Sequence, residues 1–491
     1  MELQDFPIKE IHRGLVNREF SAQELTKAYL EKITKEDKEI NAFLTLAENS
    51  ALSQAKKVDE MIQANREIPL LAGIPLAVKD NILVENIKCT AGSKILENYI
   101  APYDATVIKK LKAKGAVILG KTNMDEFAMG SSTENSAFGP TYNPHDLTRV
   151  PGGSSGGSAA AASANLCCYA LGSDTGGSIR LPASFCGVVG LKPTYGAVSR
   201  YGLISMASSL DQIGPITKTV KDAKIVFDAI SGIDEMDSTS VEIPKIGNGK
   251  LKSKKISSSP PSLSRSVIEN LRIGIPKEYF IKGMDVEVER IIKEIIKKIE
   301  ALGAKIEEIS LPHTKYSLAT YYLVMPSEAS ANLARYDGIK FGYSPGQADS
   351  LLDVYLKSRE KGFGKEVRRR IMLGTYALSA GFYEAYYLRA QKVRTKILED
   401  FNKAFEIVDL ILTPTSPAPA FKIGEKVTNP LTMYLSDIFT VSVNLAGLPA
   451  LSLPCGKAHG LPVGLQIIGK AFEETKILEA GEIFEKLCSR I

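Results

Sequence analysis

Apolar residues recur at helical spacing in several stretches of the chain. Residues 21–35 open with a Ser-Ala-Gln-Glu capping-box pattern and continue with apolar positions three and four residues apart. Residues 104–114 show the same spacing after Asp104, which we expect to cap the helix. The strongest amphipathic pattern covers residues 285–302, where aliphatic side chains share one face. The sequence predicts a helix over each stretch and a final helix over residues 475–487.

Short apolar runs without helical spacing form a second pattern. Each is about the length of a buried strand. These runs alternate with the predicted helices near both ends of the chain, which is typical of a layered α/β fold. The pattern therefore favours one large α/β domain over a string of separate modules. The predicted strands are Ala116–Gly120, Leu271–Pro276, Ile407–Leu412, Leu451–Leu453 and Leu465–Ile468.

One segment departs from both patterns. Residues 245–266 are rich in Lys, Ser, Gly and Pro. Such a composition offers little apolar surface to bury, so we expect a low-complexity loop on the surface at about this position. Two interpretations remain open for it, an inert insertion or a basic arm that contacts a polyanion.

Composition narrows the classes of function. The chain has 491 residues, of which 44% are hydrophobic and 24% charged, as in ordinary globular proteins. Its net charge of +5 is the small difference between 61 basic and 56 acidic residues, which does not favour direct nucleic-acid binding. The six cysteines include no C-x-x-C pair, and the four histidines show no ligand spacing. We therefore expect buried free thiols in a reducing compartment and no metal site.

The sequence also bears on location. Its N-terminus has neither the basic nor the apolar segment of a signal peptide, and it has no run of 18 apolar residues. We therefore expect a cytoplasmic protein that does not enter a membrane.

Residues 115–122 match the phosphate-binding pattern G-x-x-x-x-G-K-[ST] letter by letter. In a phosphate-binding loop, the residues between the two glycines must turn their N–H groups toward the ligand. Here those residues are Ala-Val-Ile-Leu, which we interpret as a buried strand. We therefore do not expect a nucleotide site at this position.

Two Gly/Ser runs are the most informative local feature of the chain. Gly152–Ser158 and Ser173–Ser178 lie about twenty residues apart, with an Ala-rich segment between them. An isolated run of this kind is most often a flexible linker. Because both runs adjoin apolar segments, we interpret them as loops in which glycine lets backbone N–H groups approach a phosphate or an oxyanion closely.

A lysine upstream of these runs is a candidate base. A serine hydroxyl is a weak nucleophile until a neighbouring group takes its proton, and no histidine motif is placed to do so. Lys79 follows the apolar run Leu76–Val78, at the end of a predicted buried strand. Burial there would lower the pKa of the lysine and let it act as a neutral base. The alternative is a lysine that pairs with a nearby acid.

These residues resemble the amidase signature family. The similarity rests on Leu76–Asp80, Gly152–Ser158 and Asp174–Arg180. It implies an α/β fold in which a single amidase-signature domain spans residues 1–491. In that domain, a mixed central β-sheet is covered by helices on both faces.

The resemblance also implies a Ser–cis-Ser–Lys triad. Ser178 would be the acyl-forming nucleophile, Ser154 the bridging serine after a cis peptide bond from Gly153, and Lys79 the base. The family often has isoleucine where this chain has threonine at position 175, a change that a backbone donor tolerates. The oxyanion hole would be formed by the N–H groups of Thr175, Gly176, Gly177 and Ser178.

A narrower resemblance, to the A subunits of the bacterial and organellar glutamyl-tRNA(Gln) amidotransferases, covers nearly the whole chain. It implies that the hydrolysed amide is the side chain of free glutamine. The ammonia would pass to a B subunit, which uses ATP and magnesium to activate the glutamate on tRNA. A small C subunit would complete a heterotrimer, tRNA would bind mainly through the B subunit, and this chain would need no cofactor. The segments concerned are Phe127–Glu134, Ser327–Ser330, Arg369–Thr375, Thr432–Tyr434 and Val443–Pro449.

A site for free glutamine needs a cation for the α-carboxylate and an anion for the α-ammonium group. The resemblance puts Arg370 in the first role and Asp437 in the second. It places Tyr321 beside them and puts Gly130 and Ser131 near the amide. By sequence alone, the run of three arginines that ends at Arg370 also fits a solvated basic face.

Two other functions remain open at this point. A stand-alone amidase that acts on other small amides would be expected to lack the pair formed by Arg370 and Asp437. A non-catalytic scaffold would not need Lys79, Ser154 and Ser178, all of which this chain retains.

Overall fold

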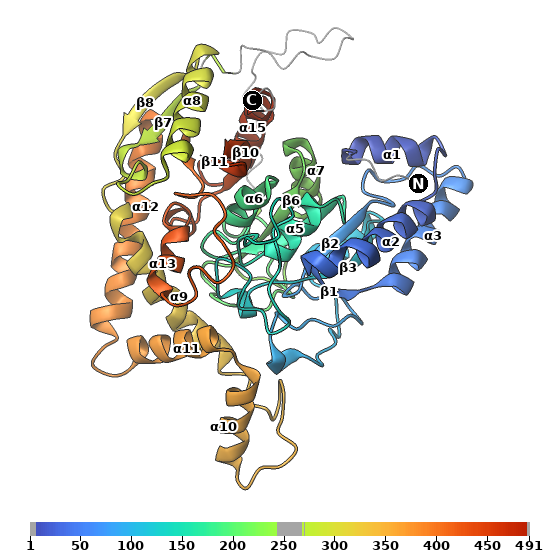
Figure 1. The fold of residues 1–491 in the computed structure, drawn as a ribbon, viewed down its shortest axis with the longest axis horizontal. Coiled ribbons are helices and arrows are strands. Elements are labelled where there is room, and N and C mark those ends of the chain that lie inside the picture. Colours follow the sequence, from blue (N-terminus) through green and yellow to red (C-terminus); the bar gives the residue numbers. More distant parts are fainter. Residues whose placement is uncertain (1–5, 243–267, 270, 489–491) are drawn as a thin grey trace.

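One mixed β-sheet runs through the part of the chain that the computed structural model describes, which is residues 6–242, 268–269 and 271–488 (Figure 1). The predicted loop at 245–266 lies outside these residues. Within them, the sheet has 11 strands in the order β1-β3-β2-β4-β6-β5-β10-β11-β9-β7-β8. The strands are β1 (Phe43–Leu46), β2 (Pro75–Lys79), β3 (Val117–Thr122), β4 (Tyr169–Asp174), β5 (Val189–Lys192), β6 (Gln212–Thr217), β7 (Arg272–Pro276), β8 (Lys305–Ile309), β9 (Leu410–Pro414), β10 (Ala450–Ala458) and β11 (Leu461–Ile468).

The sheet contains both kinds of strand pairing. Strand β2 is parallel to β3 and β4, and β7 is parallel to β8 and β9. The remaining pairs are antiparallel, and the C-terminal strands β10 and β11 lie in the middle of the sheet between β5 and β9. The predicted α/β fold with a single mixed sheet is therefore confirmed.

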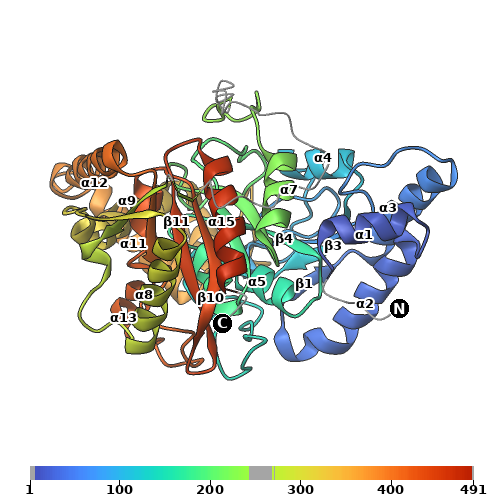
Figure 2. The ribbon, with the colours of Figure 1, turned by 90° about the horizontal axis from the view of Figure 1, so that it is seen from above.

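Helices cover both faces of this sheet (Figures 1 and 2). Helices α1 to α3 lie beside the end formed by β1 to β3, and α8 and α12 lie at the opposite end near β7 and β8 (Figure 1). The α-helices in the described residues are α1 (Ile8–Val16), α2 (Ala22–Ile40), α3 (Glu48–Gln63), α4 (Thr106–Ala113), α5 (Gly156–Ser163), α6 (Arg180–Cys186), α7 (Val220–Ile230), α8 (Val286–Ala301), α9 (Ser317–Leu333), α10 (Leu351–Gly362), α11 (Lys365–Leu378), α12 (Arg389–Ile407), α13 (Pro430–Tyr434), α14 (Val441–Leu445) and α15 (Glu474–Cys488).

The predicted helices are all present, and the capping box of α2 is confirmed. Ser21 accepts a hydrogen bond from the N–H of Glu24, whose carboxylate accepts one from the N–H of Ser21. The predicted cap of α4 is wrong. The helix begins at Thr106 with Ala105 at its N-cap, so Asp104 lies one residue too early to cap it. Its carboxylate instead accepts from the N–H of Glu85 and pairs with Lys112 at 2.8 Å.

One strand begins later than its apolar run suggests. The prediction placed a strand over Ile407–Leu412, whereas α12 continues through Ile407 and β9 begins at Leu410. Ile407 is 54% exposed at the end of α12, whereas Leu410–Leu412 are buried in β9. A short apolar run does not show where a helix ends and a strand begins.

Most of the phosphate-loop pattern at 115–122 is the strand β3 (Val117–Thr122), which overlaps the predicted strand Ala116–Gly120. Lys121 and Thr122 belong to β3 and are fully buried. The Nζ atom of Lys121 lies 3.1 Å from Asp80 Oδ1, and a Cβ atom on Gly120 would lie 2.2 Å from the carbonyl oxygen of Thr45. The lysine is therefore paired with a buried carboxylate and the glycine packs inside the sheet, so this segment does not form a phosphate site.

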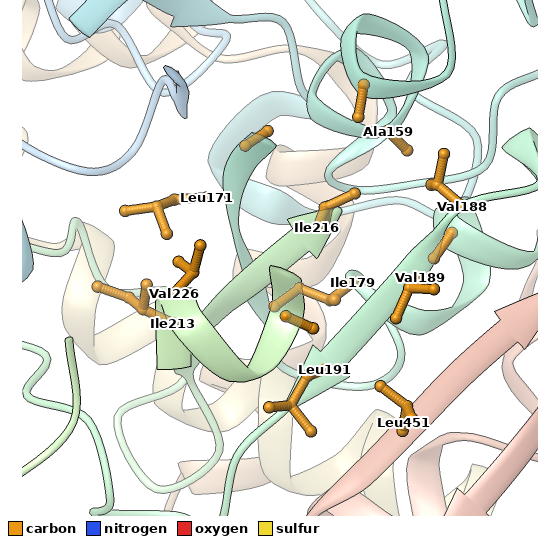
Figure 3. Packing of buried hydrophobic residues seen from close by; sticks show 14 of the residues in the cluster. Ala159, Leu171, Ile179, Val188, Val189, Leu191, Ile213, Ile216, Val226 and Leu451 are labelled. Atoms are coloured by element: carbon orange, nitrogen blue, oxygen red, sulfur yellow. The ribbon is translucent and has the colours of Figure 1, made fainter. Parts of the chain in front are cut away.

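A buried core surrounds the central strands and leads directly to the second Gly/Ser run. Figure 3 shows side chains of β4, β5, β6 and β10 packed together with Ala159 of α5 and Val226 of α7. Burial of each large aliphatic side chain stabilises the fold by about 1.5–3 kcal/mol. Strand β4 leaves this core at Asp174, so the loop that follows begins from a rigid base.

Helices α9 and α11 cross closely at Gly374. A Cβ atom on Gly374 would lie 1.9 Å from the carbonyl oxygen of Pro326 in α9. Backbone atoms in a packed helix cannot move aside as a flexible side chain can. Glycine is therefore the residue that lets these two helices meet, and both helices contribute to the site described below.

We expect Gly374→Ala to lower the free energy of unfolding by about 2 kcal/mol, because overpacking a close contact typically costs about 1–3 kcal/mol. Calorimetry of the purified chain measures this as a lower unfolding midpoint. Leu373→Ala, on the exposed side of the same helix, is the control and should change little. Equal midpoints for Gly374→Ala and the wild type would show that the helices can separate without loss.

Candidate active site

Lys79 lies at the carboxyl end of β2 with its side chain fully buried. Its Nζ atom lies 2.7 Å from Ser154 Oγ and 2.8 Å from Ser155 Oγ. Ser173 contributes two more partners, its Oγ at 3.0 Å and its carbonyl oxygen at 3.2 Å. All four partners are neutral oxygens, so these contacts do not support the alternative of a lysine paired with a nearby acid.

Burial lowers the pKa of Lys79 to about 7, although the negative charges of Asp125, Asp174 and Asp211 act in the opposite direction. A lysine with this pKa is substantially neutral at neutral pH. It can therefore accept a proton from a hydroxyl group that touches it.

Hydrogen bonds among neighbouring polar residues hold the hydroxyl groups around Lys79 in place. Asn81 Nδ2 donates to Ser173 Oγ at 2.9 Å, and Ser155 Oγ donates to the Ser173 carbonyl at 3.1 Å. The sequence analysis gave no individual role to Asn81, Ser155 or Ser173. Their position within or next to the three motifs was the available signal, but only the fold shows that they meet at one amine.

The peptide bond between Gly153 and Ser154 is cis. A Cβ atom at position 153 would lie 2.1 Å from Asp125 Oδ2 and 2.5 Å from the backbone nitrogen of Ser132. Only glycine fits there. The run then enters α5 at Gly156 and is buried throughout, so the alternative of a flexible linker is excluded.

Ser178 lies in the loop between β4 and α6. Its carbonyl oxygen accepts a hydrogen bond from the N–H of Ser155 at 3.1 Å, which ties the two Gly/Ser runs together. Ser178 is 6% exposed, whereas Ser154 and Lys79 are 0% exposed. A molecule that enters from solvent therefore meets Ser178 before it can meet the other two.

Contacts with four residues hold the loop that contains Ser178. Gly177 has a φ of +138° and its N–H donates to Asp174 Oδ1 at 2.8 Å. Added Cβ atoms would lie 2.6 Å from the Tyr321 ring at position 176 and 2.2 Å from Thr440 Oγ1 at position 177. Thr175 Oγ1 donates to Asp211 Oδ1 at 2.6 Å. These contacts fix the direction of the loop's backbone N–H groups.

A buried ion pair between the two residues that flank this loop also anchors it. Arg180 and Asp174 are fully buried, with 3.1 Å between Arg180 Nη2 and Asp174 Oδ1. Burial raises the pKa of Asp174, but the Arg180 guanidinium outweighs it and holds that pKa well below its usual range. Asn444 Nδ2 also donates to Asp174, at 2.8 Å, so the charged pair is satisfied by hydrogen bonds.

A buried carboxylate lies beside the loop. Asp437 ends η7 (Leu435–Asp437), and its Oδ2 atom accepts a hydrogen bond from Ser131 Oγ at 2.6 Å. Burial raises the pKa of Asp437 to about 7, although Ser131 and Arg370 lower it. Thr440 Oγ1 donates to the carbonyls of both Asp437 and Gly176, which connects this carboxylate to the loop of Ser178.

Arg370 is 2% exposed, whereas its neighbours Arg368 and Arg369 point to solvent. The interpretation of all three arginines as a solvated basic face is therefore wrong for Arg370. Its Nε atom donates to Glu366 Oε1 at 2.8 Å, and its guanidinium lies 5.3 Å and 5.4 Å from the ring centres of Tyr322 and Tyr434. Glu366 and Tyr322 had no role in the sequence analysis, and Tyr434 appeared there only in a segment that carries the resemblance.

Gly130 packs against Asp125, the residue that also lies close to Gly153 of the first Gly/Ser run. A Cβ atom at this position would lie 2.3 Å from Asp125 Cγ and 2.6 Å from Asn135 Nδ2. Absence of a side chain at Gly130 therefore lets the backbone before Ser131 approach Asp125.

The described residues contain no group of His, Cys, Asp or Glu side chains that could hold a metal ion. Among the helices in the described part of the chain, none is long and apolar enough to cross a bilayer. The predicted buried free thiols are found at Cys89, Cys167, Cys168, Cys186 and Cys455, whereas Cys488 is free but only partly buried.

Comparison with known proteins agrees with this geometry. The chain is 57% identical over 486 residues to the A subunit of glutamyl-tRNA(Gln) amidotransferase of Caldanaerobacter subterraneus subsp. tengcongensis, a match that covers 99% of this chain and 97% of that protein. It is similar to the crystal structure of the A subunit of glutamyl-tRNA(Gln) amidotransferase from Thermotoga maritima, with 46% identity, a TM-score of 0.77 and coverage of 98% and 94%.

A more distant structure shares the same fold. The native peptide amidase of Stenotrophomonas maltophilia is 28% identical, with a TM-score of 0.78 and coverage of 98% of this chain and 97% of that one. The amidase family model matches residues 24–478. The chain therefore belongs to the amidase signature family.

Proposed function

We propose that this chain hydrolyses the side-chain amide of free glutamine and supplies the ammonia to a tRNA-dependent amidotransferase. The observation that carries the amidase chemistry is the buried amine of Lys79 at 2.7 Å from Ser154 Oγ. The relatives that are named as A subunits of glutamyl-tRNA(Gln) amidotransferases support the choice of substrate.

In the proposed first step, Ser178 Oγ attacks the amide carbon of glutamine. Its proton passes to Ser154 Oγ as Ser154 gives its own proton to neutral Lys79. The negative charge that develops on the amide oxygen would be stabilised by the N–H groups of Thr175, Gly176 and Ser178. The Gly177 N–H, assigned to the same hole from the sequence, donates to Asp174 and so supports the loop.

In the second step, the tetrahedral intermediate collapses. The C–N bond breaks, the leaving nitrogen takes the proton back from Lys79 through Ser154, and ammonia departs from an ester of Ser178. A water molecule then attacks the ester carbon by the same proton route. The products are glutamate and ammonia, and the triad returns to its starting state.

Charged side chains support the choice of free glutamine. Asp437 would bind the α-ammonium group, and Arg370 the α-carboxylate. Both are buried, and Asp437 is connected to the catalytic loop through Thr440. Tyr321 and Ser131 would complete the pocket, with Gly130 next to the amide. A stand-alone amidase for neutral substrates would have no use for two buried opposite charges in this place.

We further propose that the chain acts in the cytoplasm in a complex with B and C subunits. The ammonia would react there with a glutamate on tRNA that the B subunit activates with ATP and magnesium. We assign tRNA binding mainly to the B subunit. We also assign ATP binding to the B subunit and not to this chain, which needs no cofactor for the steps above.

We expect Arg370→Ala and Asp437→Asn to raise the KM for glutamine about 100-fold, because a buried charge left without its partner costs about 3 kcal/mol or more. The measurement is kcat/KM for glutamine and for the neutral amide butyramide in the wild type and both variants. Butyramide should be affected much less, since it has neither charge. Glutaramate, which lacks the α-ammonium group, should be a poor substrate of the wild type and should lose less in Asp437→Asn.

The outcome separates two functions. Equal losses on glutamine and butyramide would mean that both residues support the structure, and the glutamine assignment would fail. High turnover of butyramide with no effect of either substitution would favour a stand-alone amidase.

A further inference from the structure

Arg370 lies against a pair of stacked aromatic rings from two other elements. Tyr322 comes from α9 and Tyr434 from α13, and their ring centres are 3.8 Å apart. This separation leaves no room for a guanidinium between the rings, so Arg370, at 5.3 Å and 5.4 Å from the two ring centres, lies beside the stack. One terminal nitrogen contacts Met325 Sδ at 3.7 Å. None of these three neighbours carries a charge that would pair with the guanidinium.

Glu366 lies one turn before Arg370 on α11 and joins two partners with one oxygen. Its Oε1 atom accepts from Arg370 Nε and from Tyr434 OH, both at 2.8 Å. Its Oε2 atom accepts from Arg369, whose side chain is largely in solvent. Burial raises the pKa of Glu366, but Arg370 and the hydrogen bonds of Arg370 and Tyr434 outweigh it, so the carboxylate is charged.

The position of Tyr434 connects this carboxylate to Asp437. Tyr434 is the last residue of α13, and Asp437 is the last residue of the 3₁₀ turn that follows directly. Glu366 therefore touches the cation on α11 and the segment that carries the anion. Because a guanidinium has five N–H donors, the bond at Nε leaves the terminal nitrogens able to bind a second carboxylate.

We propose that Glu366 is a positioning residue for substrate recognition, which fixes the spacing between the Arg370 cation and the Asp437 anion by binding Arg370 and Tyr434 together. This inference rests on the proposed function, in which those two charges bind the α-carboxylate and the α-ammonium group. In this role Glu366 adjusts the spacing of the two charges to that of a free α-amino acid without touching the substrate itself.

The test compares three variants of the full chain, together with any subunits that copurify with it. We expect Glu366→Ala to raise the KM for glutamine about tenfold, with kcat within about threefold and with a matching loss of selectivity over butyramide. Glu366→Gln should restore most of the affinity, because its amide oxygen can accept from both partners. Tyr434→Phe keeps the ring but loses the hydroxyl bond, and should raise the KM about threefold.

Arg369→Gln is the matched control, since it removes the exposed partner of the same carboxylate and should leave the glutamine kinetics unchanged. The inference is overturned if Glu366→Ala has an unchanged KM. It is also overturned if Glu366→Gln is no better than Glu366→Ala, or if kcat falls equally on both amides. Arg370→Ala distinguishes the two failures: if it too leaves the KM for glutamine unchanged, the proposed function fails and not only the role of Glu366.

Discussion

Ser178→Ala should abolish glutamine hydrolysis, with a fall in kcat of roughly 10⁴- to 10⁶-fold. Ser178 is the most exposed of the three proposed triad residues and lies in the loop that the Asp174–Arg180 pair holds in place. Without its hydroxyl group no ester can form, and the remaining groups supply only binding and polarisation of the amide. Release of ammonia from glutamine measures the loss.

The same variant has an internal control. The amidotransferase reaction consumes ammonia, so the assembled complex should still form glutaminyl-tRNA when an ammonium salt replaces glutamine. This rescue would show that Ser178→Ala folds and assembles. Retained glutaminase activity in Ser178→Ala would instead assign the nucleophile to another serine, with Ser154 and Ser155 as the next candidates because both touch Lys79.

Lys79→Ala and Lys79→Arg should both lose glutaminase activity by roughly 10³-fold or more. Alanine has no base, and arginine stays protonated at any accessible pH. Arginine also places a permanent charge among the neutral oxygens of Ser154, Ser155 and Ser173. Thermal unfolding identifies variants that do not fold. A well-folded Lys79→Arg variant with near wild-type turnover would show that the lysine is not the base.

The pH dependence follows from the same residue. Burial lowers the pKa of Lys79 to about 7, so the neutral, active form predominates above that pH and the protonated form below it. With butyramide as substrate, kcat should therefore fall about tenfold per pH unit as the pH drops below about 7. With glutamine, KM should also rise on the acid side, because the pKa of Asp437 is raised to about 7 and only its ionised form attracts the α-ammonium group.

Asp437→Asn separates these two titrations. In this variant the acid limb of kcat on butyramide should remain where it was, because Lys79 is unchanged. A limb that disappears in Asp437→Asn would assign the titration to the carboxylate.

The local sequence was sufficient to locate the four helices and the short apolar strands that it predicted, and the two Gly/Ser runs, but it did not predict the other elements, among them α9 and α11. Helical spacing located α2, α4, α8 and α15, because one apolar stripe on each must face the core whatever its neighbours are. The glycines of the two runs were informative for a similar reason. At positions 153 and 177, backbone or side-chain atoms approach so closely that no other residue fits, and a constraint of that kind is visible as glycine in the sequence.

Element ends and polar partners depended on long-range contacts. Asp104 looks like a helix cap in the sequence, but the helix begins one residue later than a cap at Asp104 would require, and its carboxylate binds Lys112 and the N–H of Glu85. The end of α12 at Ile407 could not be predicted from the apolar run, because Ile407 is exposed at the end of the helix although the residues that follow it are buried.

The site shows the same division between sequence and tertiary structure. Lys79 was recognisable as a candidate base because it ends an apolar strand, but its pKa depends on burial and on oxygens contributed by residues 154, 155 and 173. Apart from the resemblance, the sequence did not distinguish Arg370 from the two arginines before it. Packing of α11 against α9 and α13 buries Arg370 beside Tyr322 and Tyr434 and leaves its two neighbours in water. The sequence thus determined which charged and reactive groups the site contains. Tertiary packing determined how far each group is removed from water and which partners it has, and these two factors decide what each charge can do.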